Sequence, residues 1–450
     1  MQIIFIILTV LLETALIVLT LRKQREKALW LKNRTLSRAV EFVLLLGVVL
    51  LPLTHMKWRF TGALILLGVL LLIAGLSWLI RRKKASGDVK KGRVIASGVL
   101  SVFMIVFALV PAFLFTNYNG LETTGSYKVL ETDAILVDES RTDPFENDGS
   151  NREVAVHFYY PDAEGSFPLI VFSHGAFGYY QSNYSTYAEL VSHGYVVAAL
   201  DHPHHAFFTK DSDGRLVTVD AGFLSEAVST SNGELSEEAA FALAQKWMTL
   251  RTGDVNFVLD AIETAKANGA LNSAWRSSDD GAILRVLNVT DADRIGVMGH
   301  SMGGATAVSV GRTRSDVDAV IVLDGTMLDE ITGVENGVAS YNSEPYPVPV
   351  LDFGKKSDYS ETEQAQNEYG LVYVNKFVIE HAKDGKRVLF GNCGHMDFTD
   401  LPLFSPFLAS MLGSEKIDHE AFMNRVNGLV LNWFDYYLKE KGTLAISAEY

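Results

Sequence analysis

The chain is poor in cysteine: Cys393 is the only one among 450 residues. A single cysteine excludes an intrachain disulfide, so the folded state has to be stabilised by its core. For an exported domain, this composition is more typical of a bacterial surface than of a eukaryotic secretory route. Internal repeats and low-complexity tracts are also absent. With no second catalytic set around it, Cys393 is expected to pack in a loop.

Basic residues are missing directly after Met1, where a secretory signal peptide carries them. The first quarter of the chain instead contains four apolar stretches, at residues 3–21, 39–53, 61–80 and 94–115. A helix needs about 20 apolar residues to cross a bilayer, so three stretches approach full length and the second depends on its flanks. We therefore expect an all-α, four-helix transmembrane region over residues 1–116. Glu13, inside the first stretch, is expected to make a polar contact between helices.

Charge divides the chain at the same place. Residues 1–115 hold 16 Lys and Arg against 4 Asp and Glu, whereas the remainder holds 23 against 49. A basic membrane portion is thus joined to an acidic soluble portion. The basic residues of the first and third predicted loops are Arg22, Lys23, Arg25, Lys27, Lys32, Arg34, Arg38, Arg81, Arg82, Lys83, Lys84, Lys90, Lys91 and Arg93.

The second predicted loop holds only Lys57 and Arg59, so the loops alternate between strongly and weakly basic. The positive-inside rule places the first and third loops in the cytoplasm. The N-terminus and everything after residue 116 are then expected to be extracytoplasmic, on a multi-pass protein of the cell membrane. Because the basic runs lie between apolar spans, they argue against nucleic acid as a partner.

After a linker at residues 117–125, residues 126–450 alternate between strand and helix patterns. The predicted strands cover residues 127–137, 154–160, 169–173, 196–200, 294–298, 319–323, 348–353 and 387–390. Apolar residues at helical spacing predict long helices at 235–267 and 421–438. This alternation predicts an α/β fold with a mainly parallel sheet covered by helices on both faces.

Ser301 lies in the most informative motif of this region. It is flanked by Gly299 and Gly303, follows the apolar run at residues 295–298 and precedes a small-residue helix pattern. A strand, a glycine-flanked serine and a helix in this order describe the nucleophile elbow of the α/β-hydrolase fold. The glycines give space where a Cβ would collide with neighbouring backbone, and the helix start offers the free N–H of Met302 to an oxyanion.

A nucleophilic serine needs a histidine base and a carboxylate that orients the base. His395 ends an apolar strand in a glycine-punctuated loop, where this fold presents its base, whereas His381 and His419 have the settings of ordinary surface histidines. Two carboxylates compete for the third role. Asp324 closes the first strand after the nucleophile helix, and Asp358 follows the next strand. Spacing alone leaves both open.

Several segments, in the same order, resemble the plasma, serine-dependent platelet-activating factor acetylhydrolases. They are residues 167–175, residues 190–199, the serine elbow, residues 322–324, and His395 with Asp397 and Phe398. The resemblance runs from about residue 125 to the C-terminus. It implies an α/β-hydrolase fold, the acid at Asp324 rather than Asp358, and an oxyanion hole formed by the backbone N–H groups of Ala176 and Met302.

The chain departs from that family after residue 200, where His202, His204 and His205 replace a basic, polar segment. No Cys, His or carboxylate set at ligand spacing accompanies them, so no metal and no cofactor is expected, and the histidines are placed in a loop near the pocket rim. The aromatic run at residues 177–180 follows the predicted oxyanion turn, where it can line an acyl pocket or simply pack.

Two functions of different classes fit these patterns. The first is a membrane-anchored serine esterase of lipase-like chemistry, which cleaves carboxylic esters, including short or oxidised acyl groups of phospholipids, through Ser301, His395 and Asp324. The second is a catalytically inactive hydrolase fold that binds or senses a ligand on a membrane anchor. All three residue types of the triad occur in the expected order, which favours the enzyme.

Overall fold

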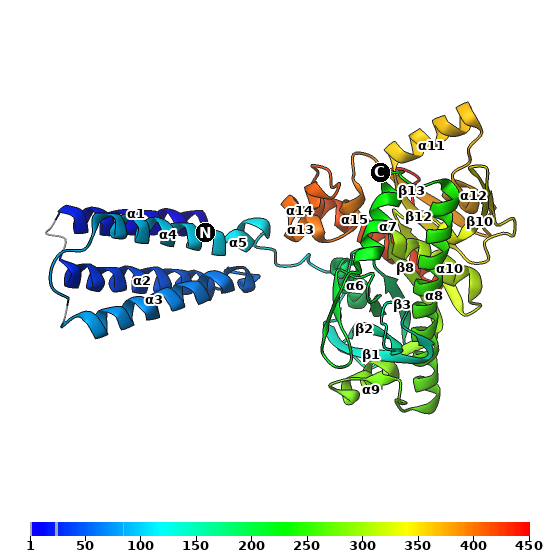
Figure 1. Ribbon diagram of the computed structural model, residues 1–450. Coiled ribbons are helices and arrows are strands. Elements are labelled where there is room, and N and C mark those ends of the chain that lie inside the picture. Colours follow the sequence, from blue (N-terminus) through cyan, green and yellow to red (C-terminus); the bar gives the residue numbers. More distant parts are fainter. Residues whose placement is uncertain (1, 23–25, 84) are drawn as a thin grey trace. The chain divides into compact units, whose positions relative to one another are not determined.

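The computed structural model in Figure 1 describes residues 2–22, 26–83 and 85–450. Three residues of the predicted basic loops, Lys23, Arg25 and Lys84, lie outside the described residues. Contacts divide the chain into two units. The N-terminal unit consists of residues 1–120 and 403–408, and the C-terminal unit consists of residues 121–402 and 409–450.

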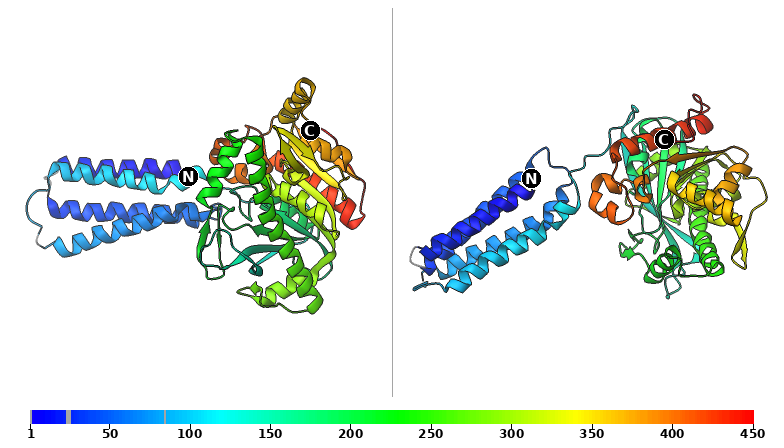
Figure 2. Two further views of the ribbon diagram at one scale, coloured as in Figure 1. Left: turned by 45° about the vertical axis from the view of Figure 1, so that its right-hand side comes forward. Right: turned by 90° about the horizontal axis from the view of Figure 1, so that it is seen from above.

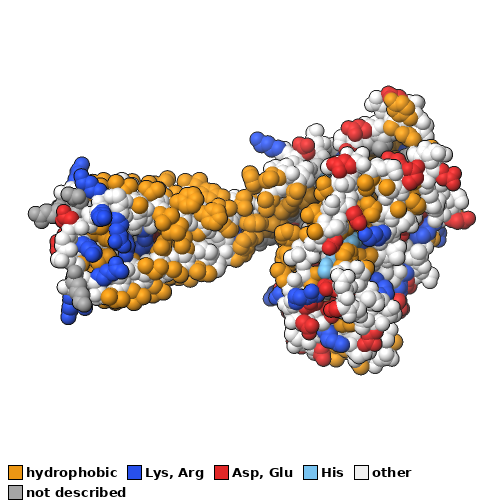
Figure 3. Space-filling model, in the orientation of Figure 1, with side chains coloured by type: hydrophobic (Ala, Val, Ile, Leu, Met, Phe, Trp, Pro, Cys, Tyr) orange, Lys and Arg blue, Asp and Glu red, His pale blue; other side chains and the backbone are white. Residues whose placement is uncertain are grey.

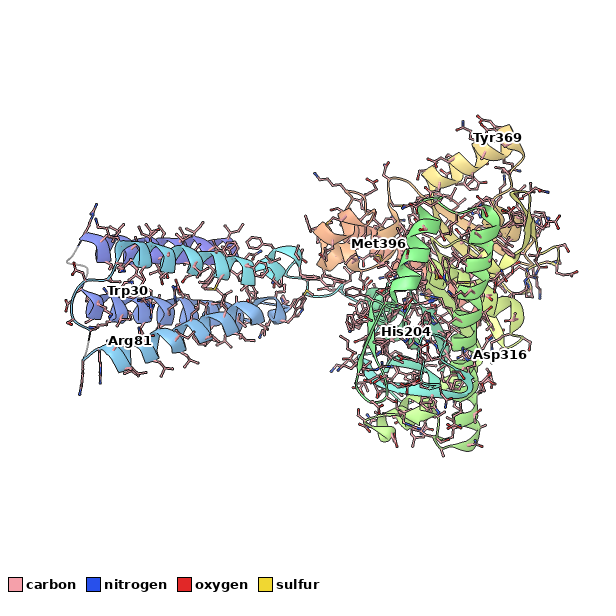
Figure 4. The ribbon with its side chains drawn as sticks, in the orientation of Figure 1. Trp30, Arg81, His204, Asp316, Tyr369 and Met396 are labelled. Atoms are coloured by element: carbon pink, nitrogen blue, oxygen red, sulfur yellow. The ribbon has the colours of Figure 1, made fainter. Side chains whose placement is uncertain are left out.

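Four long helices lie side by side in the N-terminal unit (Figures 1 and 2). Each helix packs against the next, and the first also packs against the fourth. The elements are α1 (Gln2–Arg22), α2 (Lys27–Leu50), η1 (Lys57–Phe60), α3 (Thr61–Arg81), α4 (Lys91–Ala108) and α5 (Val110–Leu114). Figure 4 shows Trp30 and Arg81 at the same end of these helices.

Among the described residues of this unit, three segments are long and apolar enough to cross a membrane: Gln2–Arg22, Lys57–Arg81 and Lys91–Ala108. The second predicted span, residues 39–53, coincides with α2 up to Leu50 and runs three residues past its end. Helix α2 is not among these segments because its first half is rich in charge. The first predicted loop is also wrong from Lys27 onward, since Lys and Arg are good helix formers and continue α2 outward. Figure 3 shows apolar side chains over much of the outer surface of these helices.

A buried polar cluster ties three of these helices together. Arg38 of α2 donates to Glu13 of α1, to Glu41 at 2.6 Å and to the Ser101 hydroxyl of α4 at 2.5 Å. All four side chains are buried. The expected inter-helix contact of Glu13 is confirmed. Because buried charges are tolerated only when they are paired, each of these helices depends on the others for its polar groups.

In the described residues of the C-terminal unit, nine strands form one sheet in the order β13-β12-β9-β8-β3-β4-β2-β1-β7. The strands from β13 to β4 are parallel, whereas β2, β1 and β7 are antiparallel to their neighbours. The bounds are β1 (Val129–Thr142), β2 (Asn151–Pro161), β3 (Phe167–Ser173), β4 (Val196–Asp201), β7 (Trp275–Arg276), β8 (Thr290–His300), β9 (Val317–Leu323), β12 (Val350–Lys355) and β13 (Gly385–Phe390). Two small hairpins add β5 (Phe208–Lys210) with β6 (Leu216–Thr218), and β10 (Ile331–Glu335) with β11 (Val338–Tyr341).

Helices cover both faces of the sheet (Figures 1 and 2). The helices packed on the sheet are α6 (Tyr184–Ser192), α8 (Glu237–Asn268), α9 (Asp280–Val289), α10 (Met302–Thr313), α12 (Val374–His381) and α15 (His419–Lys439). The other helical elements are α7 (Ala221–Ser231), η2 (Leu328–Glu330), α11 (Lys356–Tyr369), η3 (His395–Phe398), α13 (Leu401–Phe404) and α14 (Pro406–Met411). The predicted mainly parallel sheet and its two layers of helices are confirmed, as are the long helices that became α8 and α15.

Alternation along the central strand β3 explains the two apolar cores. Leu169 and Val171 face a core shared with α8, α9, α10 and α12, whereas Ile170 and Phe172 face a core shared with α6 and α15. Side chains alternate between the faces of a strand, so a strand buried on both faces has to be apolar throughout. The parallel strands therefore end at one edge of a fully buried sheet, and the loops beyond that edge carry the polar residues described next.

Candidate active site

Ser301 occupies the sharp turn between β8 and α10. Its backbone is in a sparsely populated conformation, with φ 54° and ψ −125°. A Cβ at Gly299 would come within 2.3 Å of Gly303 backbone atoms, and a Cβ at Gly303 would come within 1.9 Å of the Ser173 carbonyl oxygen. Neither distance is possible for real atoms, so only glycine allows the strand and the helix to approach this closely.

Asp324 and His395 meet beside this turn. The Ser301 N–H donates to the carbonyl of Leu323 at 2.9 Å, so the residue that follows β9 lies next to the serine in the backbone. Asp324 accepts a hydrogen bond from His395 Nδ1 at 2.6 Å. The His395 side chain is 37 % exposed and Asp324 is 10 % exposed. A carboxylate on Nδ1 leaves Nε2 free to take a proton.

Three hydrogen bonds fix the loop that carries His395. His300, which precedes the serine, donates from Nε2 to the His395 carbonyl at 3.1 Å, and the two rings lie 4.5 Å apart. Burial holds the pKa of His300 well below its usual range, so its ring is neutral. Asp397 accepts from the N–H groups of Gly394 at 2.7 Å and Glu415 at 3.0 Å.

The other sequence candidates lie elsewhere. Asp358 is in the first turn of α11 rather than in a loop, is 56 % exposed, and pairs with Lys355 at 2.7 Å. His381 is exposed and donates to a carbonyl of its own helix. His419 is not an ordinary surface residue, since it lies 3.2 Å from Asp397 and is only 20 % exposed.

Asn375 of α12 holds the segment that follows Asp324. Its amide group donates to the Gly325 carbonyl at 2.8 Å and to Asp352 at 3.1 Å, and its oxygen accepts from the Met327 N–H at 2.9 Å. Sequence reasoning missed this residue because its partners are between 23 and 50 positions away and no local motif marks it.

The turn at residues 174–176 lies against the serine. A Cβ at Gly175 would be 3.2 Å from the Ser301 Cβ. Ala176 and Met302, the predicted oxyanion-hole residues, belong to one apolar cluster with Phe177, Phe223 and other side chains of α7 and α8. The aromatic residue Phe177 thus packs on this side, 5.3 Å from the ring of Phe223.

The three closely spaced histidines lie in the loop that follows β4, but in its buried part rather than at an exposed rim. His202 and His205 are buried, and His204, labelled in Figure 4, is partly buried and stacks on Phe145. Burial lowers the pKa of His202 to about 4. In the part of the chain that the structure describes, no group of three or more His, Cys, Asp or Glu side chains is placed to hold a metal ion. Cys393 is buried in its loop, and burial raises the pKa of its thiol to about 12.

Comparison with known proteins agrees with this architecture. The sequence model of the family described as platelet-activating factor acetylhydrolase, isoform II, matches residues 150–441. Platelet-activating factor acetylhydrolase of Cavia porcellus is 24 % identical over 279 residues, which cover 60 % of this chain and 58 % of that protein. The protein of that name from Gallus gallus is 30 % identical over 183 residues, which cover 36 % of this chain and 39 % of the relative. The chain therefore spans less than two thirds of the length of either relative.

Among solved structures, a ferulic acid esterase from Streptomyces cinnamoneus aligns with a TM-score of 0.50 and 22 % identity. The alignment covers 72 % of this chain and 95 % of that one. At this identity, the likeness concerns the fold.

Proposed function

Because the chain belongs to the platelet-activating factor acetylhydrolase, isoform II, family, we propose that it is a carboxylic ester hydrolase with Ser301 as its nucleophile. The observation that carries this proposal is the 2.6 Å hydrogen bond between His395 Nδ1 and Asp324, formed beside the strained turn of Ser301. A histidine oriented by a carboxylate next to an elbow serine is the arrangement that acyl transfer requires.

In the proposed reaction, the Ser301 hydroxyl attacks the ester carbonyl while His395 Nε2 takes its proton. Asp324 keeps His395 in the tautomer that accepts there and stabilises the imidazolium. The N–H groups of Ala176 and Met302 stabilise the negative oxygen of the tetrahedral intermediate. His395 then protonates the leaving alcohol, and a water molecule, activated by the same histidine, hydrolyses the acyl-enzyme and restores Ser301.

The proposed substrates are carboxylic esters, including phospholipids with short or oxidised acyl groups. The relatives are named for a platelet-activating factor ester, and three apolar helices, long enough to cross a membrane, support a substrate from the lipid phase. We propose residues 126–450 as the catalytic domain on this anchor. An ester panel of increasing acyl length measures where the limit lies, and a preference for long chains over acetate contradicts the short-acyl assignment.

A fluorophosphonate probe tests the function directly. The probe reacts only with a serine whose hydroxyl is activated, because the phosphoryl group needs both the base and the oxyanion donors. We expect the full-length protein in detergent to be labelled once, on the peptide that contains Ser301, as read by mass spectrometry. Heat-denatured protein is the control. Absence of labelling in native protein would instead support the inactive, ligand-binding alternative.

The anchor is proposed to have four spans, with the N-terminus and the catalytic domain both extracytoplasmic. Burial of Arg38 against Glu13 and Ser101 supports α2 as a fourth span, since the charge of α2 is paired inside the helix group. In whole cells, a cysteine introduced at exposed Glu122 should react with an impermeant maleimide, and one at exposed Arg82 should not. The opposite pattern, or labelling at both positions, contradicts this topology. The native Cys393, replaced by serine in both variants, cannot contribute.

A further inference from the structure

A buried cation lies beneath the turn at residues 174–176. Arg251 of α8 is fully buried and donates to the carbonyls of His174 at 2.5 Å and Gly175 at 3.4 Å. Its Nε donates to His205 Nδ1 at 3.2 Å. Among the described residues, no carboxylate forms an ion pair with Arg251. Burying a cation without a carboxylate partner is unfavourable, so the position of Arg251 calls for a functional reason.

One of the two carbonyls that Arg251 contacts, that of Gly175 at 3.4 Å, belongs to the peptide group that carries the Ala176 N–H. The carbonyl of Gly175 and the N–H of Ala176 are two ends of the same planar amide. A donor on the carbonyl draws electron density from the N–H and makes it a stronger donor. The Gly175 oxygen also faces His174 Nδ1 at 2.6 Å and accepts from the Gly178 N–H at 3.1 Å. Several donors thus fix the plane in which the Ala176 N–H points.

A second group of buried residues connects the end of β3, just before the turn at residues 174–176, to α8. The Ser173 hydroxyl donates to His202 Nε2 at 2.8 Å, and His202 Nδ1 donates to Asp254 at 3.0 Å. The order of the three residues is that of a catalytic triad, yet Ser173 and His202 have no exposed surface and cannot meet a substrate. Their bonds link the strand end before the turn to α8.

Asp254 is already neutralised by another residue. Arg152, also fully buried, places two nitrogens on its carboxylate at 2.8 Å and 3.1 Å. Asp254 follows Arg251 by one turn of α8. The carboxylate of Asp254 is thus paired with Arg152, whereas the guanidinium of Arg251 has no carboxylate partner among the described residues. The positive charge of Arg251 is therefore directed at the carbonyls of His174 and Gly175.

We propose that Arg251 is a positioning residue of the oxyanion hole: it orients and polarises the Gly175–Ala176 peptide so that the Ala176 N–H binds the negative oxygen of the transition state. The inference rests on the proposed ester hydrolysis and assigns a new role within that site. In a dry interior, a fixed cation behind the donor stabilises charge that develops in the transition state more than it stabilises the neutral ester.

The test compares Arg251→Gln and Arg251→Lys in the full-length protein in detergent. With p-nitrophenyl acetate, we expect Arg251→Gln to lower kcat by about 30-fold while KM stays within about threefold. The reason is that the substitution weakens binding of the negatively charged transition state and not of the neutral ester. Arg251→Lys retains the charge with a single ammonium and should recover part of kcat. The affinity for methylboronic acid, whose tetrahedral adduct resembles the intermediate, should fall in parallel with kcat/KM.

Three controls separate this role from a structural one. Titration with the fluorophosphonate probe counts active sites, so kcat is expressed per competent molecule. Arg314→Gln, which removes an arginine paired with Asp260 and Asp316 on the outer side of α8, should leave kcat unchanged. Thermal unfolding identifies variants that do not fold.

An unchanged kcat per active site in folded Arg251→Gln overturns the proposal. If Arg251→Gln fails to fold, Arg251→Lys decides alone, and a reduced kcat with unchanged KM supports the role. A wild-type protein that neither hydrolyses the ester nor reacts with the probe refutes the proposed function, and the role of Arg251 with it. Active wild-type protein with wild-type kinetics in the Arg251 variants refutes the role of Arg251 only.

Discussion

Replacing Ser301 by alanine is expected to abolish hydrolysis of p-nitrophenyl acetate by the full-length protein. Removal of the nucleophile prevents formation of the acyl-enzyme, and such substitutions lower kcat by about 10⁵- to 10⁶-fold in serine hydrolases. Folding should persist, because the turn is enforced by Gly299 and Gly303 and by the hydrogen bond from the Ser301 N–H to Leu323, none of which involves the hydroxyl. Steady-state kinetics and thermal unfolding measure the two expectations.

A matched serine provides the control. Ser231 is exposed at the end of α7, so Ser231→Ala should leave both turnover and the unfolding temperature unchanged. Turnover by Ser301→Ala at the wild-type rate would falsify the assignment of the nucleophile. Loss of the folded state in Ser301→Ala would show that the hydroxyl also has a structural role.

The second large effect is expected from the acid. Asp324→Asn should lower kcat by about 10⁴-fold, since an amide in place of the carboxylate favours the wrong tautomer of His395 and leaves the imidazolium without its counter-charge. Asparagine tolerates the left-handed backbone that Asp324 adopts, at φ 48°, so the fold should survive. The measurement is kcat with p-nitrophenyl acetate, alongside the unfolding temperature.

Asp358→Asn is the matched comparison, because the sequence offers this carboxylate for the same role. It is more than half exposed and pairs with Lys355, and exposed ion pairs contribute about 0–1 kcal/mol to stability. Wild-type kcat is therefore expected. If activity survives in Asp324→Asn and is lost in Asp358→Asn, the two assignments have to be exchanged.

Most of the fold is predictable because its signals are local. Residues 169–172 of β3, 196–200 of β4 and 319–323 of β9 are apolar without interruption, and a strand segment buried on both faces requires this. The elbow of Ser301 is equally local, since two glycines within five residues mark the close approach of strand and helix. The same reasoning failed at the start of α2, because its charged residues were interpreted as a loop. In the structure these residues are helical, and Arg38 among them is paired with Glu41.

The surroundings of the site are harder to predict because their partners are distant in the chain. Arg251 and the turn it contacts are separated by 76 residues or more, and Asn375 and Gly325 by 50. An arginine in an otherwise amphipathic helix carries no local sign of burial. The burial of His202 and His205 was also missed, because it depends on distant helices: His205 stacks on Phe223 of α7, and His202 bonds to Asp254 of α8.

By itself, the amino-acid sequence determined the order of strands and helices, the strained serine turn and the apolar helices of the first quarter. Each follows from side-chain volume, polarity and glycine at neighbouring positions. Only the tertiary structure decided which carboxylate bonds to His395, and which buried charges support the turn beside Ser301. Such choices depend on a few ångströms between residues far apart in the chain, and packing of the whole sheet sets those distances.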